Sequence, residues 1–203
     1  MIRNIIFDFG GVLIGWGPKN VFRHVFKDET KMNWFLENVC TMEWNEAQDG
    51  GRTIKEAVEI LIKEHPTWEK EIKIYYERWH EMLTGPIYGT VLILQELERQ
   101  ASHRLLGLTN WSAELFPYAK KHYHFLNGFE GILVSGEENL KKPDPAIYQR
   151  MHDKFGMKKE ECLFIDDNLR NIEAAEKFGW QVIHFGSPAQ LKDELNSRFN
   201  IQV

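Results

Sequence analysis

The stretch IIFDFGGVL (residues 5–13) decides the fold of this chain. Three apolar residues (5–7) are followed by Asp8, and Gly10 and Gly11 come almost directly after it. A short apolar run of this kind is typical of a strand that is buried on both faces. The acid and the two glycines indicate either a plain turn at the end of that strand or a carboxylate held in place for chemistry, with bare backbone around it.

Four further apolar runs along the chain resemble this first strand. After NIIFDF (residues 4–9) come RLLGLT (104–109), GILVS (131–135), CLFID (162–166) and VIHF (182–185). Helix-like segments separate these runs, and two Pro residues follow good N-cap residues, at Asp144 and Ser187. This alternation predicts an α/β fold in which helices cover a parallel sheet.

Residues 15–86 have a different pattern, which predicts a helical insert directly after the first strand. Thr53 and Glu56 form a capping box ahead of an apolar stripe at helical spacing, and a second amphipathic pattern begins at Trp68. We therefore divide the chain into an α/β core domain (residues 1–14 and 87–203) and this insert.

The insert contains five of the seven tryptophans, and we expect most of them to fill the core of a small helical bundle. Trp16 and Trp44 stand at predicted helix edges or loops, so they are the better candidates for facing a cleft. The segment EWNEAQDGG (residues 43–51) reads as a loop. We expect it to offer side chains that contact a substrate hydroxyl or face water: Glu43, Asn45, Glu46 or Gln48.

Composition excludes several classes of protein. The net charge of −5 argues against a general nucleic-acid binder, which needs a basic face. Cys40 and Cys162 are too few for a disulfide framework, and we expect both to be reduced packing residues. No apolar stretch is long enough to cross a bilayer, and Asp8 interrupts the only hydrophobic segment near the N-terminus. These features predict a cytoplasmic protein, monomeric or a small homo-oligomer, without membrane or nucleic-acid partners.

Polar residues follow the predicted strands one after another. The first strand ends in Asp8, the second in Thr109 and Asn110, and the fourth in Asp166 and Asp167. Lys141 and Lys142 follow the third strand. Ligands of an open parallel sheet bind beyond the carboxyl ends of its strands, so these side chains are expected to meet at one edge.

Such a set of residues points to a bound cation and an anionic substrate. Three carboxylates close together repel one another and take up protons unless a cation neutralises them. Mg²⁺, a hard ion that prefers oxygen ligands, fits this role best. A carboxylate beside Mg²⁺ and a lysine can attack phosphorus and form an aspartyl-phosphate. Each feature alone has a simpler structural explanation, and only their joint appearance in sheet order favours the catalytic one.

The whole chain resembles the haloacid dehalogenase-like (HAD) hydrolase superfamily. Its four motifs resemble, in order, FDFGGVL (7–13), LLGLTN (105–110), KKPDPAIY (141–148) and LFIDDNLRNIEAA (163–175). The insert occupies the place of the helical cap in one subfamily. The resemblance implies a Rossmann-like sheet of order 3-2-1-4-5 and a hydrolase that acts on a small phosphorylated molecule.

The resemblance also implies roles for individual residues. Asp8 is then the nucleophile, Thr109 the phosphate donor and Lys142, the lysine next to the proline, the cation that holds both. Asn110 and Gly11 would complete the substrate site. The implied Mg²⁺ ligands are Asp8, the main-chain carbonyl of Gly10 and Asp167, with Asp166 binding directly or through water.

The chain departs from the family pattern at Gly10. Most phosphatases of the family carry a second Asp there, which protonates the leaving oxygen and contributes about 10²–10⁴-fold in rate. Three explanations stay open: a leaving group that needs less help, such as that of an anomeric sugar phosphate; a proton from a cap residue or water; or a weak or inactive enzyme. Some small-capped relatives with Gly at this position are sugar-phosphate phosphatases, which favours the first.

Two other functional classes are alternatives to a phosphatase. Dehalogenases of the family also lack the second Asp, but they use no metal and typically lose the paired acids of the fourth motif. Asp166 and Asp167 are both present here, so we favour a Mg²⁺-dependent phosphatase. A binding protein that kept the fold is disfavoured, because every residue needed for metal and phosphate binding remains.

Overall fold

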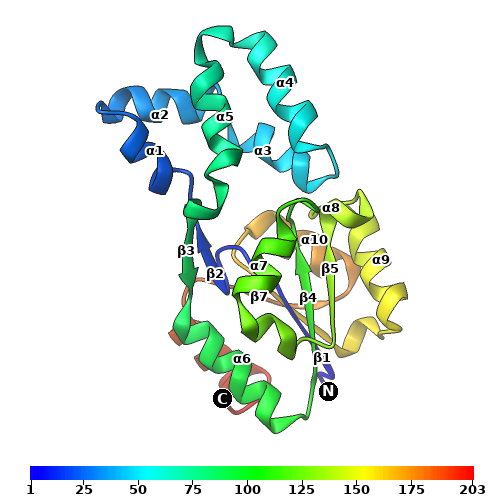
Figure 1. The fold of residues 1–203 in the computed structure, drawn as a ribbon. Helices are drawn as coiled ribbons and strands as arrows, with labels where there is room; N and C mark the ends of the chain where they lie inside the picture. Colours follow the sequence, from blue (N-terminus) through cyan, green and yellow to red (C-terminus); the bar gives the residue numbers. More distant parts are fainter.

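The computed structural model describes residues 1–203 and contains a five-stranded parallel sheet (Figure 1). Its strands lie in the order β5 (Gly131–Val134), β4 (Arg104–Thr109), β1 (Asn4–Phe7), β6 (Cys162–Asp166) and β7 (Gln181–His184). In chain order this is 3-2-1-4-5, as predicted. The first strand is therefore central, with Ile5 opposite both Leu105 and Leu163.

Alternate residues of the central strand point into two separate apolar cores. Ile5 and Phe7 belong to one core and Ile6 belongs to the other, and all three are fully buried. This explains why the strand reads as a continuous apolar run instead of an alternating one.

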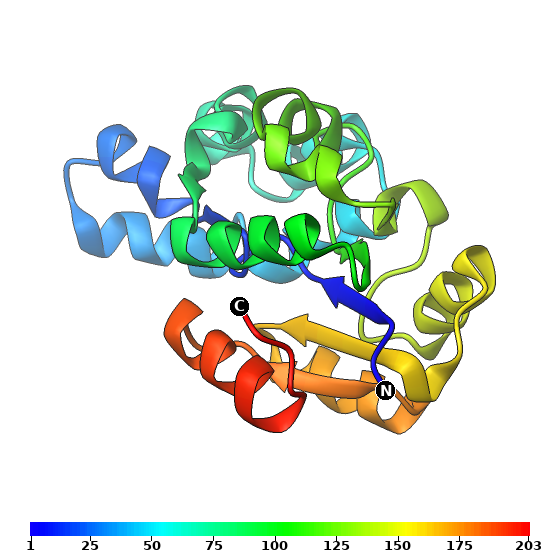
Figure 2. The same cartoon turned by 90° about the horizontal axis from the view of Figure 1, so that it is seen from below.

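Helices cover both faces of the sheet, as Figure 2 shows from below. One face packs against α6 (Tyr88–Gln100), α7 (Phe116–His122) and α11 (Pro188–Arg198). The other packs against α9 (Pro145–Phe155) and α10 (Leu169–Phe178). Shorter elements complete the core domain: η3 (His124–Gly128), α8 (Ser135–Glu138) and η4 (Lys159–Glu161).

The predicted helix ends are confirmed by the capping contacts. Asp144 accepts a hydrogen bond from the Ala146 N–H at 2.8 Å, and Ser187 forms a capping box at the start of α11. The α10 helix ends at Gly179, whose φ of 105° favours glycine.

The inserted cap is a bundle of helices above the carboxyl ends of the strands (Figure 1). Its elements are α1 (Lys19–Val25), α2 (Glu29–Asn38), α3 (Met42–Asp49), α4 (Ile54–Glu64), η1 (Pro66–Trp68), α5 (Glu69–Glu77) and η2 (Trp79–Met82). Fully buried Phe22, Phe35 and Tyr75 form its centre, with ring centroids 5.2 and 5.9 Å from that of Phe22. The α4 helix begins with the predicted capping box of Thr53 and Glu56.

The structure corrects three details of the insert. A two-stranded antiparallel sheet, β2 (Ile14–Trp16) and β3 (Leu83–Pro86), joins the cap to the core and was not predicted. EWNEAQDGG is not a loop, because most of it forms α3. Trp44 does not face a cleft: its indole N–H donates to the Ala57 carbonyl inside the cap, at 3.2 Å.

Two further expectations can be compared with the structure. Cys40 and Cys162 are buried and unpaired, as expected. None of the helices combines the length and the hydrophobicity that a transmembrane helix requires.

Candidate active site

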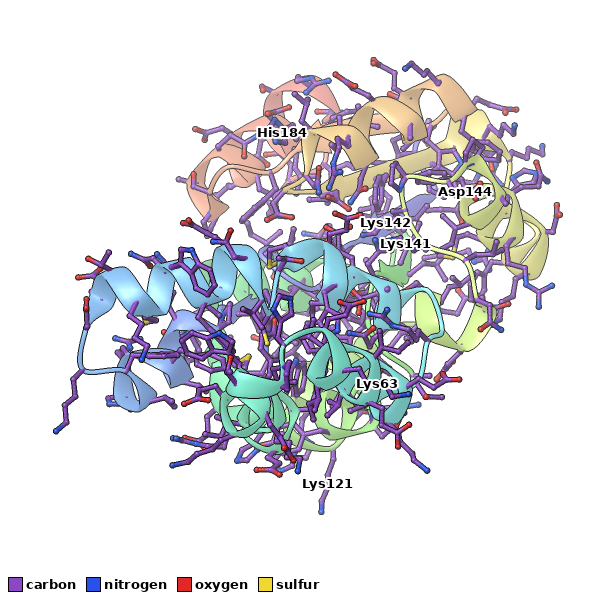
Figure 3. All side chains as sticks on the ribbon, turned by 90° about the horizontal axis from the view of Figure 1, so that it is seen from above. Lys63, Lys121, Lys141, Lys142, Asp144 and His184 are labelled. Carbon is purple, nitrogen blue, oxygen red and sulfur yellow. The ribbon has the colours of Figure 1, made fainter.

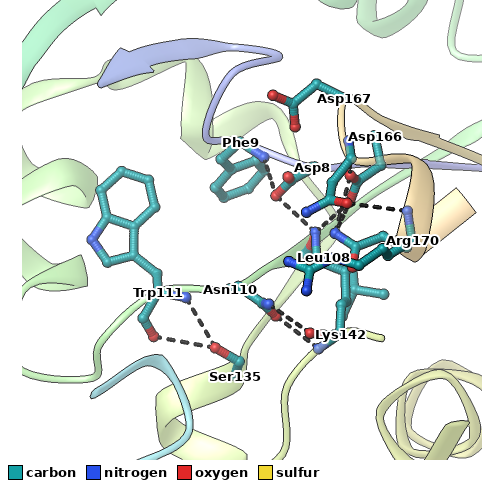
Figure 4. Close-up of polar contacts among 12 residues, drawn as sticks. Asp8, Phe9, Leu108, Asn110, Trp111, Ser135, Lys142, Asp166, Asp167 and Arg170 are labelled. Carbon is teal, nitrogen blue, oxygen red and sulfur yellow. Dashed lines mark hydrogen bonds and ion pairs between the residues drawn. The ribbon is translucent and has the colours of Figure 1, made fainter. Parts of the chain in front are cut away.

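Three carboxylates meet at the carboxyl edge of the sheet. Asp8 follows β1, Asp166 ends β6 and Asp167 comes next, so two adjacent parallel strands bring them together. One oxygen from each lies within 4.8 Å of the others (Figure 4). This is close to the spacing of about 4 Å between opposite oxygen ligands of one Mg²⁺ ion. An all-oxygen donor set of this size fits a hard divalent cation, as the sequence predicted.

Lys142 lies between two of these carboxylates. Its Nζ is 2.9 Å from Asp8 Oδ1 and 2.7 Å from Asp166 Oδ2, and it donates to the Leu108 carbonyl at 2.9 Å. The side chain is fully buried. Burial acts to lower the pKa of Lys142, but Asp166 and Asp8 outweigh it and raise the pKa. Lys142 therefore stays charged in the interior.

The Asp8 carboxylate is oriented through one of its two oxygens. Its Oδ1 accepts from the Phe9 N–H at 2.7 Å as well as from Lys142, whereas Oδ2 has no protein partner. Burial raises the pKa of Asp8 to about 7, against the lowering effect of Lys142 and with a smaller rise from Asp166. The free Oδ2 is thus the atom available to attack an electrophile or to bind a cation.

Asp166 and Asp167 have different environments. Asp166 is fully buried and accepts hydrogen bonds from the Asn168 N–H at 2.7 Å and from Asn171 Nδ2 at 3.0 and 3.1 Å. Asp167 is exposed to the cavity, and burial followed by the Asp166 charge raises its pKa. Asp167 is therefore free to bind a metal directly, whereas Asp166 is already held by Lys142 and Asn171.

Thr109 and Asn110, at the end of β4, differ in their hydrogen bonding. Thr109 Oγ1 is buried without a hydrogen-bond partner, which is the state expected of a donor that waits for a ligand oxygen. The Asn110 amide is bonded to the Lys142 backbone, accepting from its N–H at 2.8 Å and donating to its carbonyl at 2.9 Å. Asn110 thereby positions the lysine.

A cavity of about 270 Å³ lies between cap and core above these residues. Trp16, Trp79 and Trp111 line it together with polar residues, among them Asn45 and Asp49. Trp16 thus faces a cleft, as predicted. Asp8, Gly10, Gly11 and Asp167 line the cavity as well, whereas Thr109, Lys142 and Asp166 lie buried beside it.

Contacts across the boundary between the cap and the core domain, which we call the seam, keep the two parts close together. Glu46 of α3 lies 3.4 Å from Lys141 Nζ and 3.6 Å from Arg170, and Figure 3 shows Lys141 and Lys142 where cap and core meet. Glu114 of the core accepts from the first N–H of α4, at Ile54, at 2.8 Å. Lys141 therefore contacts the cap, whereas its neighbour Lys142 reaches the carboxylates.

The candidate residues in the cap segment EWNEAQDGG differ in whether they line the cavity. Asn45, Glu46 and Gln48 line the cavity, but Glu43 does not. The Gln48 amide is already engaged, since its Nε2 donates to the Trp44 carbonyl and its Oε1 accepts from Arg52.

Asn171 and Asp49 were missed by the sequence reasoning. Asn171 is the third residue of α10, in the motif that also contains Asp166, and its position in the motif was the available signal. Asp49 ends α3, where the negative end of the helix dipole disfavours a carboxylate. An acid placed against that dipole was the one feature of the sequence that could have drawn attention to this position.

We expect Gly11→Ala to lower the free energy of unfolding by about 1–3 kcal/mol, the cost of a strained backbone position. The φ of Gly11 is +74°, and an added Cβ would lie 2.1 Å from Asp167 Oδ2. The Asp167 carboxylate would have to move away from this Cβ, and we expect that movement to weaken Mg²⁺ binding as well. Denaturant unfolding and a Mg²⁺ titration measure the two effects.

Gly10→Ala is the matched control for this prediction. A Cβ at Gly10 meets no heavy atom within 4 Å, and its φ lies outside the left-handed region. We expect a change of less than about 1 kcal/mol. Equal losses in the two variants would show that the approach of Asp167 to Gly11 is unimportant.

The fold and the site define a capped α/β protein with a cluster of oxygen donors at the carboxyl edge of its sheet. The model of the haloacid dehalogenase-like hydrolase family matches residues 5–185, and the chain belongs to this family.

Two curated relatives match most of the chain. A sesquiterpene phosphatase of Aspergillus oryzae is 27% identical over 180 residues, which are 88% of this chain and 87% of that protein. A drimenol cyclase of Aspergillus calidoustus is 24% identical over 200 residues, 98% of this chain. The chain spans only 37% of the length of the cyclase.

Solved structures share the fold. A HAD-family enzyme of Bacteroides thetaiotaomicron, in complex with magnesium and inorganic phosphate, has a TM-score of 0.69 at 21% identity and covers 92% of this chain and 96% of its own. An L-2-haloacid dehalogenase of Xanthobacter autotrophicus has a TM-score of 0.64 at 20% identity, over 97% and 83% of the two chains.

Proposed function

We propose that this HAD-family hydrolase is a Mg²⁺-dependent phosphomonoesterase that acts on a small phosphorylated metabolite. The observation that carries the proposal is the meeting of three carboxylates around one point, with Lys142 bonded to two of them. The three carboxylates and Lys142 carry a net charge of −2, which one Mg²⁺ ion would neutralise. The bound ion and the Lys142 ammonium would then attract an anionic phosphate ester.

The proposed reaction has two displacements at phosphorus. Asp8 Oδ2 attacks the phosphorus atom, the bond from phosphorus to the ester oxygen breaks, and an aspartyl-phosphate forms. Water then attacks the phosphorus of this intermediate and releases inorganic phosphate and free Asp8. Lys142 holds the nucleophile in place, and the unpartnered hydroxyl of Thr109 donates to a phosphate oxygen.

The metal site would consist of Asp8, the carbonyl of Gly10 and Asp167, with Asp166 binding the ion directly or through water. Bound Mg²⁺ supplies positive charge that offsets the charge of the transferred phosphoryl group. The binding of magnesium and phosphate by a structural neighbour of the same fold supports this assignment.

We further propose that residues 15–86 act as a cap that encloses the substrate and that the substrate is a sugar phosphate. Three indole rings and several polar side chains line a cavity of about 270 Å³, which suits the apolar face and the hydroxyl groups of a small sugar. The sesquiterpene phosphatase among the relatives makes a terpenyl phosphate the second substrate to test.

A 2-haloacid dehalogenase is the alternative function, favoured by the dehalogenase of the same fold. The paired acids Asp166 and Asp167 argue against it, because in a metal-free site Lys142 is the one cation beside three carboxylates and cannot neutralise them all.

A substrate screen distinguishes the two functions. We expect phosphate release from phosphomonoesters that requires Mg²⁺ and stops in EDTA, with no halide release from 2-haloacids. Asp167→Ala should lower this activity by about 10²-fold or more, because a metal supplies several kcal/mol of transition-state stabilisation. Halide release that persists in chelator would establish the dehalogenase instead.

A further inference from the structure

The cavity above Asp8 has open space at the position where most phosphatases of this family carry their proton donor. Gly10 lines the cavity, and an added Cβ there would meet no heavy atom within 4 Å. A phosphate ester with a poor leaving group still needs a proton on the departing oxygen. A donor other than water must then come from another residue that lines the same cavity.

Four carboxyl groups line the cavity, and three of them are committed to other contacts. Asp8 is held by Lys142 as the proposed nucleophile, and Asp167 lies against Gly11 as a proposed metal ligand. The Glu46 carboxylate is paired with Lys141 and Arg170 across the seam. The remaining group is Asp49, the last residue of α3 in the cap.

The surroundings of Asp49 favour its protonated form. Burial raises the pKa of Asp49 to about 7, although the nearby Lys141 lowers it. Glu46 adds to the rise, while Lys142 and a hydrogen bond from the Ser112 backbone oppose it. The position at the carboxyl end of α3 acts in the same direction as burial.

The other titratable groups near Asp49 belong to the helix packed beside α3. Burial is the main cause of the raised pKa values of Tyr75 and Tyr76 in α5. The charge of Asp49 raises both pKa values further. Both tyrosines therefore stay neutral at the pH at which Asp49 titrates.

We infer that Asp49, contributed by the cap, is the proton donor to the leaving group. It replaces the second Asp that most phosphatases of the family carry at the position of Gly10. The inference rests on the proposed phosphatase function. As Asp8 Oδ2 bonds to phosphorus and the ester bond breaks, the Asp49 carboxyl gives its proton to the departing alkoxide, which leaves as an alcohol. The resulting Asp49 carboxylate then takes a proton from the water that hydrolyses the aspartyl-phosphate. Proton transfer thus requires the cap to be closed, which couples substrate enclosure to chemistry.

The test compares two phosphate esters that differ in their need for a proton. An alkyl ester such as a hexose 6-phosphate releases a strongly basic alkoxide, whereas 4-nitrophenyl phosphate releases a stable phenolate. We expect Asp49→Asn to lower kcat on the alkyl ester by about 10²–10⁴-fold and on the aryl ester by less than about 10-fold. Wild-type kcat on the alkyl ester should fall as the pH rises through about 7, and Asp49→Asn should lose this fall.

Two further variants keep the test specific. Glu46→Gln, on the same helix, weakens the cap contact and should lower turnover of both esters by the same factor. Gly10→Asp added to Asp49→Asn supplies a carboxyl from the core and should restore part of the alkyl-ester activity, since the added side chain has room.

The results separate the inference from the function on which it rests. Equal losses on the two esters in Asp49→Asn, or no recovery in the double variant, would overturn the role of Asp49 and leave the phosphatase in place. Wild-type protein that releases phosphate from neither ester, with Mg²⁺ present, would overturn the proposed function and the inference with it.

Discussion

Asp8→Asn is expected to lower phosphate release by about 10⁴-fold or more, as the removal of a covalent nucleophile does in other enzymes. The carboxylate is the only group whose free oxygen lies beside both Lys142 and the other two acids. An amide in its place is uncharged, so it neither attacks phosphorus nor binds the cation as strongly. Initial rates of phosphate release at saturating substrate and Mg²⁺ measure this effect.

The same variant should keep its fold, which separates a lost nucleophile from a lost structure. Asn has nearly the shape of Asp, and Lys142 retains its 2.7 Å ion pair with Asp166. We expect the free energy of unfolding to change by about 1 kcal/mol at most. Turnover within tenfold of the wild type would contradict the assignment of the nucleophile.

Lys142→Met is expected to lower the free energy of unfolding by about 3–5 kcal/mol, the usual cost of removing one partner of a buried ion pair. The change leaves Asp8 and Asp166 close together in the interior without their shared cation. A loss of this size is a large part of the stability of a typical domain, about 5–15 kcal/mol. Phosphatase activity should be lost as well, and denaturant unfolding measures the stability.

Lys141→Met is the matched control, because the two lysines are adjacent in sequence. The Lys141 side chain is 36% exposed and pairs with Glu46 at 3.4 Å, so we expect it to lose less than about 1 kcal/mol. Adding Asp166→Asn to Lys142→Met should restore part of the stability by removing one of the two unpaired charges. Similar small losses in Lys141→Met and Lys142→Met would contradict the structural role given to Lys142.

The parallel sheet could be predicted because its strands are buried on both faces, whereas its strand order was implied by the resemblance to the haloacid dehalogenase-like family. Ile5, Ile6 and Phe7 all face apolar cores, so their run of apolar residues is a direct record of burial. The carboxyl ends of parallel strands share an edge, and the meeting of Asp8 with Asp166 and Asp167 follows from that geometry. The catalytic roles of these residues stay predictions.

The details of the cap could not be predicted to the same extent. The β2 strand has three residues, one of them Gly15, and offers no alternation to recognise. The α3 helix buries only Trp44 and Gln48, which are too few for an apolar stripe, so its sequence indicates a loop. The environment of Asp49 depends on the packing of α3 over the core, which no local pattern records.

Acid quenching of the enzyme during turnover, followed by mass spectrometry of its peptides, tests the central claim most directly. We predict that a phosphoryl group is found on Asp8, is lost when substrate is exhausted and is absent from Asp8→Asn. Steady phosphate release with no phosphoryl group on Asp8, or with the group on another residue, would contradict the account.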